Sequence, residues 1–228
     1  CMSILLATLL LLIILFGPQL WVQAVFRRHA KPRPELAGNG GEFARHLLNQ
    51  LHMADVGVEP ADGGDHYDPV SKTVRLNKDR LEGKSLTAIV VAAHEVGHAL
   101  QDRLGYQPLR WRSQLVFLAQ AAQKLGNIMF ILAPVVAGLA RAPSVAIIML
   151  LAVVVSFGSA ALLHLITLPV EWDASFRRAL PLLEAGHYLS EEDQAAARQI
   201  LTAAAFTYVA ASLASLLNLW RWLRWVKR

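Results

Sequence analysis

The residues His94, Glu95 and His98 have the types and the spacing of a metal-dependent hydrolase site. Residues four apart lie on one face of an α-helix, so His94 and His98 can direct imidazole nitrogens at the same metal ion. Zinc at that point would lower the pKa of a bound water to about 7, and Glu95 would accept the proton of that water. Glu95 would later pass the proton to the leaving amine. The motif predicts hydrolysis of peptide bonds without a covalent intermediate.

A catalytic zinc site needs a third protein ligand and an open fourth position. Cys1 is the only cysteine in the chain, so this ligand has to be a histidine or a carboxylate. Glu171 is the first candidate, because it stands at the polar end of an apolar run. The rival candidates are His164, seven residues earlier in that run, and His187.

Two further roles at such a site stay open from the residues alone. Asp173 could orient a ligand imidazole, as metal-bound histidines usually require, or it could pair with Arg177 one helical turn later. A donor to the developing oxyanion would have to be a side chain in a loop that ends in a polar group. Four side chains of this kind are His66, Tyr67, His187 and Tyr188. Nothing in the sequence brings them to the zinc, and solvated loop residues are the better interpretation.

The motif lies within a polar region, residues 27–112, which is predicted to be the catalytic region. A helix over residues 85–104 carries the motif, with Ser85 as its N-cap and Gly105 as its stop. Thr73, Val74, Arg75 and Leu76 alternate polar and apolar side chains, as in a half-buried strand of a short hairpin or meander.

The composition indicates a membrane protein. The chain of 228 residues is 55% hydrophobic, with a mean hydropathy of +0.39. Its long uncharged runs predict transmembrane helices over 1–26, 113–140, 143–168 and 198–220, with a polar segment over 169–197 and a basic aromatic tail over 221–228. The expected fold class is a mainly α, integral membrane protein with about four transmembrane helices and a small zincin-like α/β catalytic unit.

Membrane topology explains the net charge of +5 better than binding to nucleic acid does, since the polar region has no basic stripe with interleaved aromatic residues. Basic residues flank the predicted spans on the side of the polar regions, which the positive-inside rule assigns to the cytoplasm. The basic tail argues the other way. The expected location is a membrane, as a multi-pass protein in contact with the lipid bilayer, with the site on the cytoplasmic side.

With these residues in view, the chain resembles the YugP-like neutral zinc metallopeptidases, a bacterial membrane family, over nearly its whole length. The resemblance rests on four stretches in the same order. They are Asp65-His-Tyr-Asp-Pro with Thr73-Val-Arg-Leu, Val91-Ala-Ala-His-Glu-Val-Gly-His-Ala-Leu-Gln, Leu168-Pro-Val-Glu-Trp-Asp-Ala-Ser, and residues 203–217 with Thr207-Tyr-Val-Ala-Ala. The architecture is also similar to the HtpX and CAAX prenyl protease group.

The resemblance implies that Glu171 is the third ligand of one catalytic Zn²⁺. It also implies that Thr73 to Leu76 is an edge strand that pairs with an extended substrate backbone. The chain departs from many glutamate zincins, which place an aspartate four residues after the ligand glutamate, because that position here is Ser175. The implied location is the bacterial inner membrane, and the implied partners are protein or peptide substrates at that membrane.

Two hypotheses from other classes compete with an endopeptidase. A catalytically silent zinc-binding membrane scaffold would keep the metal for structure, but it would not need Glu95. A metal transporter or sensor would use His164 inside a span, but the predicted spans offer few further ionisable residues for a path.

Overall fold

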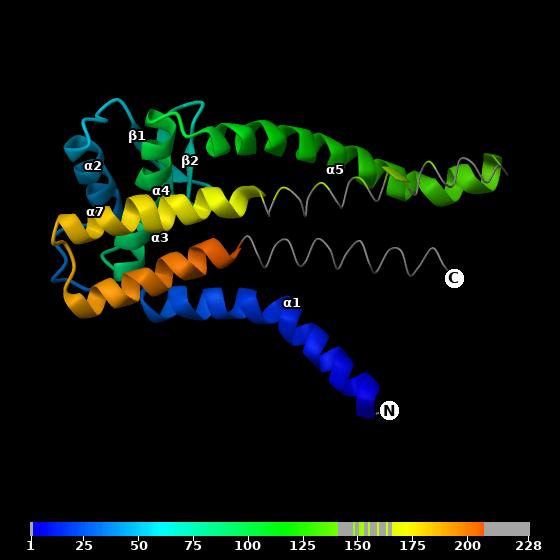
Figure 1. Ribbon diagram of the computed structural model, residues 1–228, viewed down its shortest axis with the longest axis horizontal. Coiled ribbons are helices and arrows are strands. Elements are labelled where there is room, and N and C mark those ends of the chain that lie inside the picture. The colour runs from blue at the N-terminus through cyan, green and yellow to red at the C-terminus, as the bar shows by residue number, and fades with distance from the viewer. Residues whose placement is uncertain are drawn as a thin grey trace. The chain divides into compact units, whose positions relative to one another are not determined.

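The computed structural model describes residues 2–140 and 166–207, together with isolated positions between those ranges. It is mainly helical with a small sheet (Figure 1). In chain order the elements are α1 (Met2–Arg28), α2 (Gly40–Gln50), β1 (Gly57–Ala61), β2 (His66–Asp68), β3 (Thr73–Asn77), α3 (Lys78–Leu81), α4 (Leu86–Arg103), α5 (Gln107–Ala140), the π-helix η1 (Asp173–Ala179) and α7 (Leu180–Ala185). Residues 166–172 and 191–207 are also helical.

The chain divides into two compact units. The first contains Cys1–Leu109 and Pro169–Thr207, and the second contains Arg110–Leu168 and Tyr208–Arg228. The elements that carry the HExxH motif and Glu171 belong to the first unit. The candidate site can therefore be described within that unit alone.

The prediction of an integral membrane fold with four transmembrane helices is contradicted. Among the described residues, no helix is both long and apolar enough to cross a membrane. A span needs about 20 consecutive apolar residues. From Phe16 onward α1 carries Gln19, Gln23 and Arg27, and α5 carries Lys124 among several glutamines. The predicted spans over 143–168 and 198–220 lie largely outside the described residues.

Helix α4 is the centre of the first unit. Ser85 has an extended backbone and its side chain accepts a hydrogen bond from the amide of Ala88, which confirms the predicted N-cap. The helix ends before Gly105, whose φ of 66° is accessible to glycine without strain. Fifteen of its 18 residues are buried, so the helix is interior on nearly every side. It packs against α2, α3, the sheet and η1.

The predicted strand at Thr73 to Leu76 forms as β3, but its expected position at an edge is wrong. The strand order is β1-β3-β2, with β1 parallel and β2 antiparallel to β3. β3 is therefore the central strand, and its backbone pairs with neighbours on both sides. Val74 and Leu76 are completely buried, so their side chains hold the sheet on the core. A substrate cannot add to this strand, because both of its hydrogen-bonding edges are occupied.

The acidic residues before β3 have structural partners. Asp65 accepts a hydrogen bond from the amide of Asn77 and forms an ion pair with Arg80. Asp68 accepts hydrogen bonds from Ser71 and Arg75 across the β2–β3 turn. Together with the turn-forming bond from the Val70 amide, these contacts hold the Asp68 pKa at about 2 although burial raises it. The Asp65-His-Tyr-Asp-Pro stretch thus shapes the hairpin.

Candidate metal centre

His94 and His98 lie on the same face of α4, as their spacing of four predicts. Both side chains are buried, and their rings meet edge to face with centroids 4.8 Å apart. Small neighbours on α4, such as Ala93 and Gly97, leave room for another segment to approach the imidazoles. Two buried imidazoles at this distance are arranged to bind the same group.

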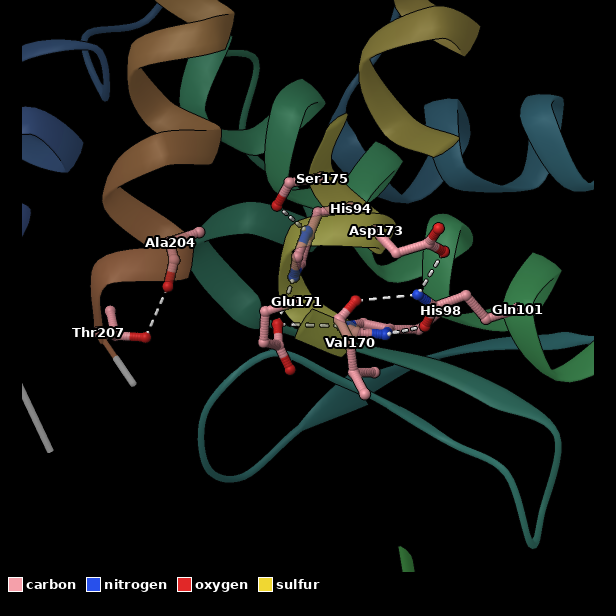
Figure 2. Close-up of polar contacts among 9 residues, drawn as sticks. All are labelled: His94, His98, Gln101, Val170, Glu171, Asp173, Ser175, Ala204 and Thr207. Carbon is pink, nitrogen blue, oxygen red and sulfur yellow. Dashed lines mark hydrogen bonds and ion pairs between the residues drawn. The ribbon is translucent and has the colours of Figure 1, made fainter. Parts of the chain in front are cut away.

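That other segment brings Glu171 between the two imidazoles (Figure 2). Its Oε2 lies 3.1 Å from His94 Nε2 and 3.2 Å from His98 Nε2. The three ligand atoms lie within 4.8 Å of one another, and all three residues are buried. The structure therefore brings together the two motif histidines and the first candidate for a third ligand.

The charge state of Glu171 suits a cation site. Burial raises the pKa of this carboxyl, but the charges of His98 and His94 and their hydrogen bonds outweigh burial and hold the pKa well below its ordinary value. The carboxylate is therefore ionised at neutral pH. An ionised carboxylate that is only 1% exposed requires a positive charge close by, from imidazolium groups or from a metal ion.

The donor set fits zinc. Two histidines and a glutamate are a donor set of catalytic zinc sites, which keep a fourth position open. Each imidazole also has a partner at its other nitrogen: the hydroxyl of Ser175 lies 3.1 Å from His94 Nδ1, and Gln101 Oε1 lies 2.9 Å from His98 Nδ1. These partners leave both Nε2 atoms to face Glu171, which is the orientation that a shared metal ion requires.

Asp173 bonds Gln101 and not an imidazole, so it does not orient a ligand imidazole directly. Its Oδ2 accepts hydrogen bonds from Gln101 Nε2 at 2.8 Å and from Arg178 Nε at 3.2 Å. The arginine partner is Arg178, five residues later, and not Arg177. The reason is η1: a π-helix pairs residue i with i+5, so its wider turn brings Arg178 over Asp173.

Glu95 is buried at the centre of α4, beside His94. Its charge acts on Arg80 on α3: burial lowers the pKa of Arg80, and the negative charge of Glu95 raises it. Arg80 also forms the ion pair with Asp65 and lies over the ring of Phe26, 5.4 Å from its centroid. The carboxylate next to the candidate metal ligands thus lies within the electric field of the Arg80 guanidinium.

Three of the four candidate oxyanion donors have other hydrogen-bond partners. Tyr67 donates a hydrogen bond to Asp102, one turn beyond His98, and burial together with this bond raises its pKa above the ordinary value. His66 is bonded to the carbonyl of Gly64, and Tyr188 is bonded to Gln50 and His46 near α2. His187 has a φ of 50° in the turn after α7. His164 lies outside the described residues.

Two residues of the site were not found by sequence reasoning. Gln101 stands three positions after His98, a spacing that places it on the neighbouring helical face. Ser175 stands four positions after Glu171, where the sequence shows only the absence of an aspartate. A search for hydrogen-bonding side chains three or four residues from each ligand would have found both.

Gly97 makes the closest approach between α4 and η1. A Cβ at this position would lie 2.7 Å from the carbonyl oxygen of Ala174 and 3.3 Å from Arg178 Cβ. Because the nearer atom belongs to the backbone, the two helices would have to move apart. Gly97 therefore allows η1 to bring its polar side chains to the imidazoles.

Gly97→Ala is expected to destabilise the protein by about 1–3 kcal/mol, the usual cost of overpacking a core. Helix propensity alone would predict the opposite sign, because alanine is about 1 kcal/mol more favourable than glycine inside a helix. The urea midpoint of unfolding, measured without metal, checks this. Gly63→Ala is the matched control, since a Cβ there meets nothing within 4 Å. A Gly97→Ala protein as stable as the control would contradict the close approach.

Comparison with known proteins identifies relatives along almost the entire chain. The family described as "Putative neutral zinc metallopeptidase" matches residues 4–227. A Bacillus subtilis protein named "Putative membrane protease YugP" is 36% identical over 208 residues, which cover 90% of this chain and 88% of that protein. No solved structure is significantly similar.

Proposed function

Because the chain belongs to the neutral zinc metallopeptidase family, we propose that it is an endopeptidase with one zinc ion held by His94, His98 and Glu171. The observation that carries this proposal is the convergence of three buried ligand atoms from two separate segments of the chain. A purely structural role for zinc would not call for a second acidic group, Glu95, beside the ligands. The proposal assigns each of these four residues a chemical task.

The chemistry divides between the metal and the chain. When bound, zinc supplies a Lewis acid that polarises a scissile carbonyl and lowers the pKa of a water molecule to about 7. Glu95 accepts a proton from the attacking water and donates it to the leaving amine, as a general base and then a general acid. The positive charge of Arg80 on α3 interacts with the negative charge of Glu95.

The arrangement of the sheet supports the proposed substrate class. β2 is an outer strand, it packs against α4, and Tyr67 ties it to Asp102 on that helix. An extended peptide that adds to the free edge of β2 would be held along its backbone and not by a terminus, which is the recognition mode of an endopeptidase. This proposal assigns to β2 the role that β3 cannot fill.

The location of the substrate is inferred from the relative. The printed name of the Bacillus subtilis protein is that of a membrane protease, and we propose that this chain also acts on proteins at a membrane. The predicted orientation toward the cytoplasm depends on spans that the described residues do not provide, so it forms no part of the proposal.

Removal of zinc tests the proposed function. Purified protein treated with 1,10-phenanthroline is expected to lose cleavage of casein, and one equivalent of zinc is expected to restore it. The measurements are bound zinc by elemental analysis and peptide release by mass spectrometry. A protein that binds one zinc per chain and never cleaves would support the silent scaffold. Cleavage that continues without metal would contradict zinc catalysis.

A further inference from the structure

Gln101 is a completely buried amide at the junction of the two segments that form the metal centre. Its Oε1 lies 2.9 Å from His98 Nδ1 on α4. Its Nε2 donates to the carbonyl of Val170 at 2.9 Å and to Asp173 Oδ2 at 2.8 Å. Figure 2 shows these contacts around the amide. One side chain therefore bonds a candidate metal ligand on α4 and two residues that flank Glu171, Val170 before it and Asp173 after it.

The orientation of this amide is determined by its partners. Val170 offers a carbonyl oxygen, and Asp173 offers a carboxylate oxygen, and both can only accept a hydrogen bond. The NH₂ group of Gln101 must face these two acceptors. The reverse orientation would place the Gln101 oxygen against both of them and leave two close contacts between acceptors. The oxygen of Gln101 is therefore directed at His98.

This orientation determines the form of His98. An amide oxygen can only accept, so His98 Nδ1 has to carry the hydrogen. Nε2 is then the nitrogen that remains for a metal ion, and it is the atom that faces Glu171 Oε2 at 3.2 Å. His94 is held less strictly, because the Ser175 hydroxyl can either donate or accept. The two ligand histidines thus differ in how firmly the chain selects their metal-binding form.

Asp173 and Arg178 hold the amide in turn. Asp173 is only 4% exposed, and the same Oδ2 that accepts from Gln101 also accepts from Arg178. Arg178 neutralises the buried carboxylate, so the charge of Asp173 is compensated inside the protein. The contacts thus form a series in which Arg178 bonds Asp173, Asp173 bonds Gln101, and Gln101 bonds His98.

We propose that Gln101 is a positioning residue for zinc, and that Asp173 acts on the metal centre through Gln101 and not on an imidazole directly. The proposal deepens the proposed function and rests on zinc being bound by His94, His98 and Glu171. It assigns to a neutral amide the part that a carboxylate plays in many zinc sites, where groups bonded to the ligand histidines change metal affinity by about 10–100-fold.

The test compares Gln101→Met with Thr87→Val. Methionine keeps the length of the side chain and removes every hydrogen bond of the amide. Thr87 is an equally suitable control on the same helix, because it is buried and donates to the carbonyl of Phe26 far from the ligands in sequence. Gln101→Met is expected to weaken zinc binding by about 10–100-fold, and Thr87→Val is expected to leave it unchanged. Zinc affinity is measured by competition with a chromophoric chelator.

Cobalt gives a readout that a loss of stability would not change. Zinc has no d–d absorption, whereas Co²⁺ in its place absorbs visible light according to its ligand geometry. The spectrum of the Co²⁺ form is expected to change in Gln101→Met and to stay as in the wild type in Thr87→Val. Wild-type zinc affinity together with a wild-type Co²⁺ spectrum in Gln101→Met would overturn the proposal.

Asp173→Ala provides the second test and also serves if Gln101→Met does not fold. It is expected to weaken zinc binding, although Asp173 is not a ligand. Combined with Gln101→Met it should add little, because both changes interrupt the same series of contacts. Unchanged affinity in Asp173→Ala, or full additivity in the double variant, would show that Asp173 does not act through Gln101. A wild-type protein that binds no zinc would instead refute the proposed function.

Discussion

Glu95→Gln is expected to lower kcat for peptide hydrolysis by about 10²–10⁴-fold, the usual contribution of a general acid–base group, while bound zinc stays at one per chain. The amide of glutamine keeps the size of the carboxylate but cannot accept a proton from water. Because His94, His98 and Glu171 are unchanged, the metal site should remain filled. The measurements are steady-state cleavage of a peptide substrate and zinc content of the same sample.

The substitution leaves Arg80 with an ion-pair partner. Arg80 senses the charge of Glu95, but it keeps Asp65 as its ion-pair partner when that charge is removed. Glu192→Gln, which removes an exposed carboxylate, is the matched control and should cleave as the wild type does. Wild-type hydrolysis by Glu95→Gln would contradict its role as the base. If Glu95→Gln lost both its bound zinc and its hydrolytic activity, Glu95 would be needed to maintain the metal site, and its catalytic role would be unsupported.

The parts of the site that depend on local spacing could be predicted from the sequence. His94 and His98 meet because residues four apart on a helix share a face, and the helix itself is indicated by Ser85 and Gly105. Glu171 is brought between the imidazoles as expected, although it lies 73 residues beyond His98. Here the limited choice of ligand types helped, since a chain with one cysteine has to use histidine and carboxylate.

The parts that depend on a change of helical period could not be predicted. η1 has the π-helical pattern, and no simple residue pattern indicates where an α-helix widens into a π-helix. This widening pairs Asp173 with Arg178 and brings Ser175 to His94. An interpretation based on a spacing of four residues favoured Arg177 as the partner of Asp173. The function of Asp173 therefore became visible only in three dimensions.

Strand order is a second property that the sequence did not determine. The alternation in Thr73 to Leu76 predicted a strand correctly, but alternation reports only which face is buried. It does not tell whether a strand is central or outer. β1 pairs in parallel with β3 after a long connection through β2, and this closes the edge that the resemblance reserved for substrate. Hydropathy has the same limitation, because apolar runs show a need for burial and not the surroundings that provide it.

Glu171→Ala is expected to weaken zinc binding by at least about 100-fold and to abolish hydrolysis at limiting zinc. Four-ligand zinc sites in peptides bind with roughly 10–16 kcal/mol, so one ligand accounts for about 3 kcal/mol, which is about 100-fold in affinity. The loss of zinc affinity should exceed the contribution of an average ligand, because Glu171 is the only anionic ligand of the three and is almost completely buried. Chelator competition measures the affinity directly.

The comparison with Glu184→Ala makes this result specific. Glu184 belongs to the same part of the chain, at the end of α7, but its carboxylate is 44% exposed and pairs only loosely with Arg198 at 3.5 Å. Its removal should leave zinc affinity as in the wild type, since an exposed ion pair contributes little. Excess zinc should restore part of the hydrolysis in Glu171→Ala, because His94, His98 and Glu95 remain in place. Unchanged affinity in Glu171→Ala would remove it from the ligands and direct the search to His164 or His187.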